Sequence, residues 1–438
     1  MAKVLIAFLL ALSSLAFAAD SELAQSVAQD YETRLKLLFE HFHRNPELSF
    51  QEFNTSARLA KELRTAGFEV TEGIGKTGVV AIMKNGPGPL VMMRADMDAL
   101  PVEEKTGLSY TSQVVQKDEE GKPVKVMHAC GHDLHITSLV GIAHQMAARR
   151  NAWSGTLMLV GQPAEERLGG ASAMKRDQLW KRFGQPDVVL AFHVASGIEA
   201  GKIEAIEGSP YSGVDTVEII IHGVGAHGAS PHRGKDPIVL GAQIVLALQT
   251  IITREISPRE PALITVGSFH AGTRSNIIPD TAKLQLTVRS ESPATRRLLL
   301  DAIRRVSLNT ARAAGFPEDK LPEIIETETS TPPVINDLAL TKRVKKVWEE
   351  KMGKTVFAES KPRDHMSADD FSFFITNPPI PALYFSVGGT PKADFERARN
   401  GGAAIPSHHS PLFKISPEPA IKAGVEASVA ALLDLMKK

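Results

Sequence analysis

The sequence predicts an α/β fold in which a doubly wound, mostly parallel sheet forms one domain and a ferredoxin-like α+β unit is inserted into it. Apolar runs without alternation, at 78–83 and 156–161, indicate strands buried on both faces of a sheet. After about residue 211 the strands alternate between apolar and polar positions. The unalternated pattern resumes towards the end of the chain. We therefore expect a discontinuous domain of residues 19–211 and 328–438 around an insert of 212–327.

The composition is that of an ordinary globular protein. Of its 438 residues, 43% are hydrophobic and 23% are charged. Lys plus Arg equals Asp plus Glu at 50 each, so no net field attracts nucleic acid or an anionic membrane. We therefore expect no nucleic-acid partner, and no membrane association once the first residues are removed.

The first 18 residues have the pattern of a signal peptide. Lys3 gives a short positive region, 4–15 is an apolar run too short to span a bilayer comfortably, and a small-x-small motif ends at Ala18. We expect cleavage after Ala18 and export, to a bacterial periplasm. An uncleaved anchor or a buried first helix is the alternative.

The first part of the larger domain alternates helices and strands. Apolar spacing predicts helices that a proline at position 46 separates, and then buried strands joined by a further helix. The expected helices are 21–45, 53–66 and 134–150, and the expected strands are 78–83, 90–93, 156–161 and 188–192. Acids or imidazoles follow several of these strands. Because ligands bind outside the carboxyl ends of strands in open α/β sheets, a common site there is expected.

The insert has a different order of elements. Strands are expected at 216–221, 262–269, 281–289 and 321–327, and helices at 237–255 and 294–314. The order strand-helix-strand-strand-helix-strand is that of a ferredoxin-like unit. The first domain then resumes with a helix at 338–352, a strand at 381–387 and a final helix at 417–435.

Two stretches carry the chemistry of the chain. MHACGHDLH at 127–135 holds the only cysteine, Cys130, two residues before His132, and QPAEE at 162–166 places Glu165 and Glu166 directly after a strand. Thiolate, imidazole and carboxylate are ligands of zinc and related metals. Two adjacent acids allow one to hold metal while the other moves protons. The pattern predicts the core of a metallohydrolase.

Structural interpretations of the same residues remain open. Cys130 could be a small buried apolar residue, and the acid pair could cap a following helix. Asp98 could form a turn, His193 could be a core histidine, and His227 and His232 could be polar loop residues. The roles of His128, His135 and His408 are also left open.

Six motifs together resemble one known family. They are RADMDALP (94–101), HACGHD (128–133), QPAEE (162–166), GAHGASPH (225–232), NIIPD (276–280) and HHSP (408–411). Their order and spacing are similar to those of the amidohydrolase subfamily of the aminoacylase/carboxypeptidase metallopeptidases. That group includes hippurate hydrolases, N-acyl amino acid amidohydrolases and plant auxin-conjugate hydrolases.

The resemblance implies roles for individual residues. Glu165 would be the general base towards the attacking water, and Asp98 would orient a ligand imidazole. His227 would reach across a dimer interface to polarise the scissile carbonyl. Two divalent metal ions, zinc or manganese with cobalt or nickel also compatible, would be held by Cys130, His132, Glu166, His193 and His409. Substrate contacts would come from Asn276 and Arg289, and the insert would be the lid and dimerisation domain of a homodimer.

The expected activity is metal-dependent hydrolysis of the amide bond of an N-acyl L-amino acid. A carboxypeptidase or dipeptidase acting on a short peptide needs the same site and is the closest alternative. A hydrolase with Cys130 as nucleophile would resist chelators, and a non-catalytic binding protein would not need the paired acids. The acyl group and the amino acid are not specified by the sequence.

Overall fold

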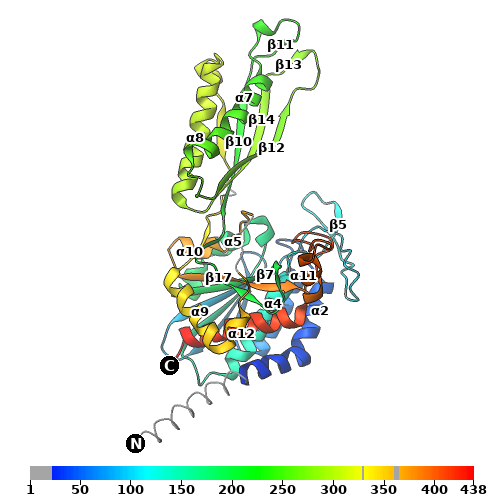
Figure 1. Cartoon of the computed structure of the whole chain (residues 1–438), viewed down its shortest axis with the longest axis vertical. Helices are drawn as coiled ribbons and strands as arrows, with labels where there is room; N and C mark the ends of the chain where they lie inside the picture. The colour runs from blue at the N-terminus through cyan, green and yellow to red at the C-terminus, as the bar shows by residue number, and fades with distance from the viewer. Residues whose placement is uncertain (1–21, 328–329, 360–364) are drawn as a thin grey trace, which may run out of the picture. The chain divides into compact units, whose positions relative to one another are not determined.

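The chain forms two compact units (Figure 1). The computed structural model describes residues 22–327, 330–359 and 365–438, so the predicted signal segment 1–18 lies outside the described residues. Within these ranges the first unit runs to Pro210 and resumes at Ile335 and at Phe373, and the second unit contains Tyr211–Val334 and 365–372. The predicted insert, 212–327, lies within the second unit.

The first unit is built on a seven-stranded sheet in the order β1-β2-β6-β3-β7-β17-β8. The central strands β6, β3, β7 and β17 are parallel, whereas β1, β2 and β8 pair antiparallel at the edges. The strands are β1 (Glu69–Ile74), β2 (Gly78–Asn85), β3 (Leu90–Asp96), β6 (Gly155–Gln162), β7 (Val188–Glu199), β8 (Ile203–Glu204) and β17 (Ala382–Thr390). The predicted mostly parallel α/β fold is confirmed.

The central strands are buried on both faces, as their unalternated sequences predicted. Leu157 and Leu159 of β6 belong to the main core cluster, and Met158 between them is equally inaccessible although its side chain points the other way. Helices must therefore cover both faces of this sheet.

The helices of the first unit surround that sheet. They are α2 (Lys36–Arg44), α3 (Phe53–Thr65), α4 (His132–Ala148), α5 (Gly170–Arg176), α6 (Leu179–Phe183), α9 (Leu338–Met352), α10 (Ser372–Thr376), α11 (Lys392–Arg399) and α12 (Pro417–Leu435). Residues 22–30 are helical and continue through a π-helical turn, Tyr31–Leu35, into α2. The central helix α4 packs against α12 and against β3 and β7 (Figure 1). It begins at His132, two residues earlier than predicted, so His132 lies in its first turn.

The second unit has the predicted ferredoxin-like order. Its elements are β10 (Gly213–His222), α7 (Pro237–Thr250), β12 (Ala262–Ala271), β14 (Thr281–Ser290), α8 (Pro293–Ala313) and β15 (Glu323–Glu326). The antiparallel sheet has the order β12-β14-β10-β15. In β10 the side chains of Val217, Ile219 and Ile221 are fully buried and alternate with partly exposed ones, so one face packs on the helices.

Helix α7 starts at a defined cap. The Asp236 carboxylate accepts hydrogen bonds from the backbone N–H groups of Ile238 and Val239, and Pro237 occupies the first turn. The helix continues through a π-helical turn, Ile251–Glu255. Together these 19 residues are long and apolar enough to cross a membrane by length and composition, and 33% of their most apolar stretch is buried within the protein.

Short elements complete the structure. Pairs of short strands are β4 (Val115–Lys117) with β5 (Pro123–Lys125), β11 (Ala226–His227) with β13 (Ile277–Ile278), and β9 (Gly208–Tyr211) with β16 (Val334–Asn336). The 3₁₀ turns are Glu165–Arg167, Pro231–Arg233, Glu318–Lys320 and Lys354–Val356.

Candidate metal centre

Parallel strands carry most of the candidate side chains to one edge of the first sheet. Strand β3 ends at Asp96, two residues before Asp98, and β6 ends at Gln162, just before the acid pair. The parallel neighbour β7 carries His193. Because the carboxyl ends of parallel strands share one edge, motifs far apart in sequence converge there.

The structure brings all five predicted metal ligands together. Potential donor atoms of Cys130, Glu166 and His409 all lie within 4.8 Å of one another. The Cys130 Sγ atom is 3.5 Å from His193 Nε2, and His409 Nε2 is 3.2 Å from Glu166 Oε2.

His132 joins this group through the acid pair. Its Nε2 atom lies 3.8 Å from an oxygen of Glu165 and 3.8 Å from an oxygen of Glu166. Donor atoms of these three residues also lie within 4.8 Å of one another. Glu166 therefore belongs to two adjoining donor groups.

Several of these donors are buried with no hydrogen-bond partner among the residues that the structure describes. Neither ring nitrogen of His132 makes a hydrogen bond, although the side chain is fully buried, and Glu166 Oε1 is also unpartnered. Burying polar atoms in this way is costly unless something compensates them. A mixed sulfur, nitrogen and carboxylate donor set fits a divalent transition metal. The residues present therefore fit a metal centre.

The Cys130 thiol needs such a cation to ionise. Burial, with the nearby Glu166 and Glu165 carboxylates, raises the pKa of Cys130 well above its usual range. A bound divalent cation reverses this balance because metal ligation favours the thiolate. Without a cation the thiol stays protonated and is a poor nucleophile.

Asp98 fixes the acid pair through its backbone. Its Oδ1 accepts a hydrogen bond from Glu165 N at 3.0 Å, and its Oδ2 accepts one from Glu166 N at 3.1 Å. The same Oδ1 lies 3.3 Å from His132 Nδ1. The Ser49 hydroxyl donates to Oδ2 at 2.6 Å. Asp98 thus contacts both a ligand imidazole and the loop of the acids, whereas the sequence suggested only the first contact.

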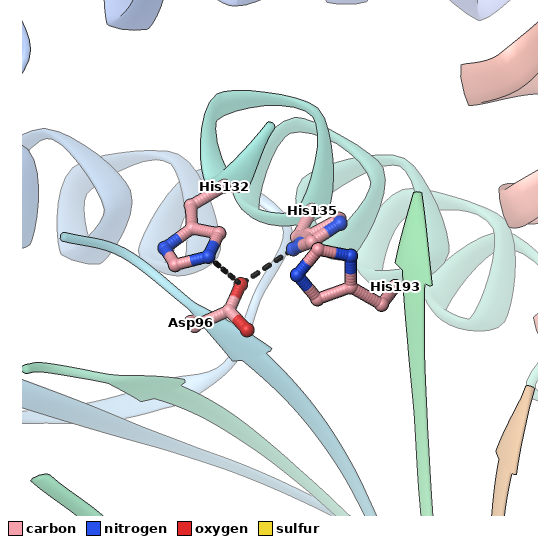
Figure 2. Close-up of side chains that lie close together, drawn as sticks. All are labelled: Asp96, His132, His135 and His193. Atoms are coloured by element: carbon pink, nitrogen blue, oxygen red, sulfur yellow. Dashed lines mark hydrogen bonds and ion pairs between the residues drawn. The ribbon is translucent and has the colours of Figure 1, made fainter. Parts of the chain in front are cut away.

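Asp96 and His135 form a supporting network beside the ligands (Figure 2). Asp96 Oδ1 is 2.5 Å from His135 Nδ1. Asp96 Oδ2 accepts a hydrogen bond from Arg94 at 2.6 Å. Burial opposes ionisation of Asp96, but Arg94, His132 and His135 outweigh it and hold its pKa well below its usual range. Asp96 was not among the predicted site residues, although an acid at the end of a buried strand was a usable signal.

The backbone of Val194 fixes the orientation of His193 and two other histidines. Val194 N donates to His135 Nε2 at 2.8 Å, so His135 Nδ1 carries the proton towards Asp96. Val194 O lies 2.7 Å from His193 Nδ1 and 2.8 Å from His408 Nε2, both of which donate to it. His193 Nε2 is then the lone-pair nitrogen that faces Cys130.

His408 and His409 are adjacent but differ in environment. His408 is neutral because burial lowers its pKa to about 4, and it donates to a backbone carbonyl. His409 has a left-handed backbone, φ 67°, and faces Glu166. His409, the predicted ligand of the two, thus lies beside Cys130 and Glu166. His128 is buried, and within the described part of the chain neither of its ring nitrogens makes a hydrogen bond, whereas His232 is exposed.

The remaining predicted residues belong to the second unit. His227 lies on β11 and pairs with Ile277 of β13, and Gly228 N donates to Asn276 O at 2.8 Å, so His227 and Asn276 are neighbours. Arg289 on β14 donates to the backbone oxygen of Met366 at 2.7 Å. The structure fixes these three positions within the second unit only.

A buried imidazole anchors the start of α4, which carries His132. His43 Nδ1 is 2.6 Å from Asp133 Oδ2, and His43 Nε2 is 3.1 Å from Glu104 Oε1. Both ring nitrogens can donate only in the imidazolium form. Burial alone would lower the pKa of His43, but these carboxylates outweigh it and raise the pKa to about 9.

This triad predicts a pH-dependent loss of stability. The folded pKa of His43 is raised from 6.5 to about 9, which corresponds to roughly 3 kcal/mol. Because the pKa is raised, this contribution is complete below pH 6.5 and is lost as the pH rises through about 9. The difference in unfolding free energy between wild type and His43→Gln should therefore shrink from pH 6 to pH 10, measured by denaturant titration. A difference that stays constant with pH would contradict a charged His43.

Comparisons with known proteins agree with this geometry. A model of peptidase family M20/M25/M40 matches residues 92–432. Thermostable carboxypeptidase 2 of Saccharolobus solfataricus is 36% identical over 84% of this chain and 87% of its own length. The hippurate hydrolase of Campylobacter jejuni is 36% identical over 79% of this chain and 86% of its own. The crystal structure of a dinuclear metal-binding peptidase of the M20 family from Bacillus subtilis superimposes with a TM-score of 0.75 at 27% identity, covering 93% of this chain and 99% of that one.

Proposed function

This chain belongs to peptidase family M20/M25/M40, and from that premise we propose that it hydrolyses the amide bond of an N-acyl L-amino acid to a carboxylate and a free amino acid. The resemblance drawn from its six motifs is confirmed. Metal-dependent amide hydrolysis is the chemistry that the family and its relatives share with this donor set.

The observation that carries the proposal is a donor cluster in which Cys130, His132 and His193 are buried, with a second acid beside Glu166. Cys130, His132, Glu166, His193 and His409 would hold the metal. Glu165 also has a donor atom within 4.8 Å of donor atoms of His132 and Glu166, and we assign it to proton transfer. Metal-assisted hydrolysis of an amide can use one acid to hold metal and its neighbour to move protons.

The chain's own residues supply the proton transfers. A bound divalent cation would act as a Lewis acid that makes water a stronger nucleophile and polarises the scissile carbonyl. Glu165 would accept the proton of the attacking water and return it to the leaving nitrogen. Asp98 keeps Glu165 in place, because it binds the Glu165 backbone N–H.

We propose two divalent ions per chain, zinc or manganese. The two adjoining donor groups that share Glu166 support this number, as does the dinuclear relative. Cobalt or nickel would also fit, because metal availability rather than affinity often decides occupancy. Metal analysis of the purified protein tests both points.

The substrate class is tested by amino acid release from a panel of N-acetyl, N-benzoyl and longer N-acyl L-amino acids, with unblocked dipeptides included. Release from at least one N-acyl amino acid supports the proposal. Release from dipeptides alone would favour the second candidate, a carboxypeptidase or dipeptidase. The 36% identity to a carboxypeptidase keeps that candidate open.

Two other functional classes receive less support. A Cys130 nucleophile would need a low thiol pKa, whereas burial and two carboxylates raise it. A binding protein without activity would not need two acids held by Asp98 at their backbone amides.

We further propose that the second unit is a lid that joins two copies of the chain as a homodimer. Strand β12 is at the edge of its sheet and pairs only with β14 among the described residues. Beside it, α7 exposes apolar side chains, with Val239 55% and Leu246 72% accessible. A second copy of the same strand and helix would cover both features. His227 would then act in the partner's site, with Asn276 and Arg289 contacting substrate.

Leu246→Glu should therefore give a monomer with kcat lowered by about 10²–10³-fold, the usual cost of losing one oxyanion donor. Light scattering gives the mass and the substrate assay gives kcat. Leu37→Glu is the matched control, because Leu37 is 67% accessible but lies on α2 of the first unit. A Leu246→Glu protein with the mass and kcat of the wild type would rule out this interface.

We also propose export to a periplasm with cleavage after Ala18. This rests on the pattern of the first 18 residues, which lie outside the described structure. Terminal sequencing of the mature protein from the periplasmic fraction tests it. A mature chain that still begins at Met1 would contradict it.

A further inference from the structure

We propose that Glu52 is a positioning residue whose buried carboxylate holds the turn that presents Glu165 to substrate. The inference rests on the proposed role of Glu165 as the base. Glu52 was not among the residues that the sequence motifs singled out.

The Glu52 side chain joins three separate parts of the first unit. It is fully buried at the start of α3. Its Oε1 accepts hydrogen bonds from Phe50 N at 2.9 Å and from Ala164 N at 2.8 Å. Its Oε2 accepts one from the Thr77 hydroxyl at 2.5 Å. The contact with Ala164 spans 112 residues of sequence and ends at the residue before Glu165.

The turn that Glu52 holds has an unfavourable backbone. Ala164 has φ 48°, in the left-handed region, which costs a residue with a Cβ on the order of 1 kcal/mol or more. The turn is also tightly closed, because a Cβ at Gly170 would lie 1.5 Å from Pro163 O. Such a conformation persists only where its surroundings fix it.

Two carboxylates supply that constraint. Glu52 binds the amide of Ala164, and Asp98 binds the amides of Glu165 and Glu166. Three successive N–H groups are thus each bound by a buried acid. Loss of the contact between Glu52 and Ala164 would release the turn just before Glu165, while the contacts of Asp98 with Glu165 and Glu166 remain.

Another acid, Glu47, already caps the start of α3. The Glu47 carboxylate caps α3 by accepting from Asn54 N and from Thr55 N, whereas Glu52 makes no capping hydrogen bond to that helix. Burial and the nearby Asp98 carboxylate raise the pKa of Glu52 to about 7, so keeping an acid here is costly. Of the three contacts of that acid, the one with Ala164 N reaches the turn before Glu165.

The test compares three variants of the full metal-loaded protein. Glu52→Ala should lower kcat by about 100-fold, the effect of misplacing a reacting group, with KM and bound metal unchanged. Glu52→Gln should retain most of kcat, because its amide oxygen can still accept from Ala164 N and its NH₂ can donate to Thr77. Glu47→Ala is the matched control: it should lower the melting temperature without changing kcat.

A double-mutant cycle separates positioning from general stability. In a Glu165→Gln background, Glu52→Ala should change the residual kcat by less than about threefold, because the base that it positions is already gone. An equal loss in both backgrounds, or a loss of bound metal, would overturn the inference. Should Glu52→Ala not fold, Glu52→Asp, whose carboxylate is one methylene shorter, goes through the same cycle.

Failure of the Glu52 inference can be distinguished from failure of the proposed function. An active wild type in which Glu52→Ala has normal kcat would overturn this inference alone. A wild type that hydrolyses no N-acyl amino acid or peptide would overturn the proposed function and, with it, the role of Glu52.

Discussion

Glu165→Gln is expected to lower kcat for amide hydrolysis by about 10²–10⁴-fold, because glutamine cannot accept the proton of the attacking water. The variant should keep its shape and position, since Asp98 binds the backbone N–H of residue 165 and not its side chain. Bound metal should remain at the wild-type level, because the proposed ligands are intact.

Steady-state kinetics and metal analysis on the same preparation check this expectation. Unchanged kcat would remove Glu165 from the mechanism. Loss of both metal and activity would instead make Glu165 a ligand, and its neighbour Glu166 would become the candidate base.

Glu166→Ala is expected to lose bound metal, whereas Glu165→Gln is expected to keep it. Glu166 contributes donors both to the group with Cys130 and His409 and to the group with His132 and Glu165. Its removal should lower the bound metal and reduce kcat/KM by at least about 100-fold, since even residues that only support ligands cost 10–100-fold. Metal analysis after dialysis, with Glu165→Gln as the matched control, measures the difference. A Glu166→Ala protein with full metal content would contradict the proposed ligand set.

The parts of the fold with local signals could be predicted from sequence. Buried runs such as 156–161 gave the strands of the parallel sheet, and the order of elements gave the ferredoxin-like unit. The helices at 338–352 and 417–435 have the predicted bounds. The antiparallel edges were not predicted, because the pairing partner of a short strand such as β8 is not encoded in its own residues.

The candidate ligands could also be predicted from sequence, because their signals are local. Cys130, His132 and the acid pair lie in short contiguous motifs whose residue types are themselves ligands. The contacts that support these ligands could not be predicted from sequence. The contacts of His43 with Asp133 and of Glu52 with Ala164 span 90 and 112 residues, and only the folded backbone shows them. Asp98 was assigned an imidazole contact, but its hold on two backbone amides has no sequence signal.

Backbone geometry also explains features that residue types could not. Strand β7 continues past His193 to Glu199, further than the predicted strand end at 192, and within it Val194 O accepts from two histidine rings. The segment 365–372 belongs with the second unit although it lies well beyond the predicted insert. Arg289 donates to the backbone oxygen of Met366 in this segment. The sequence suggested a substrate contact for Arg289 and gave no sign of this backbone contact.

Metal dependence of amino acid release tests the central claim most directly. The protein is stripped with a chelator, its metal content is measured, and release from the best N-acyl amino acid is followed before and after addition of zinc or manganese. The account predicts that activity disappears with the metal and returns with one of these ions. Undiminished release from a protein shown to hold no metal would contradict it.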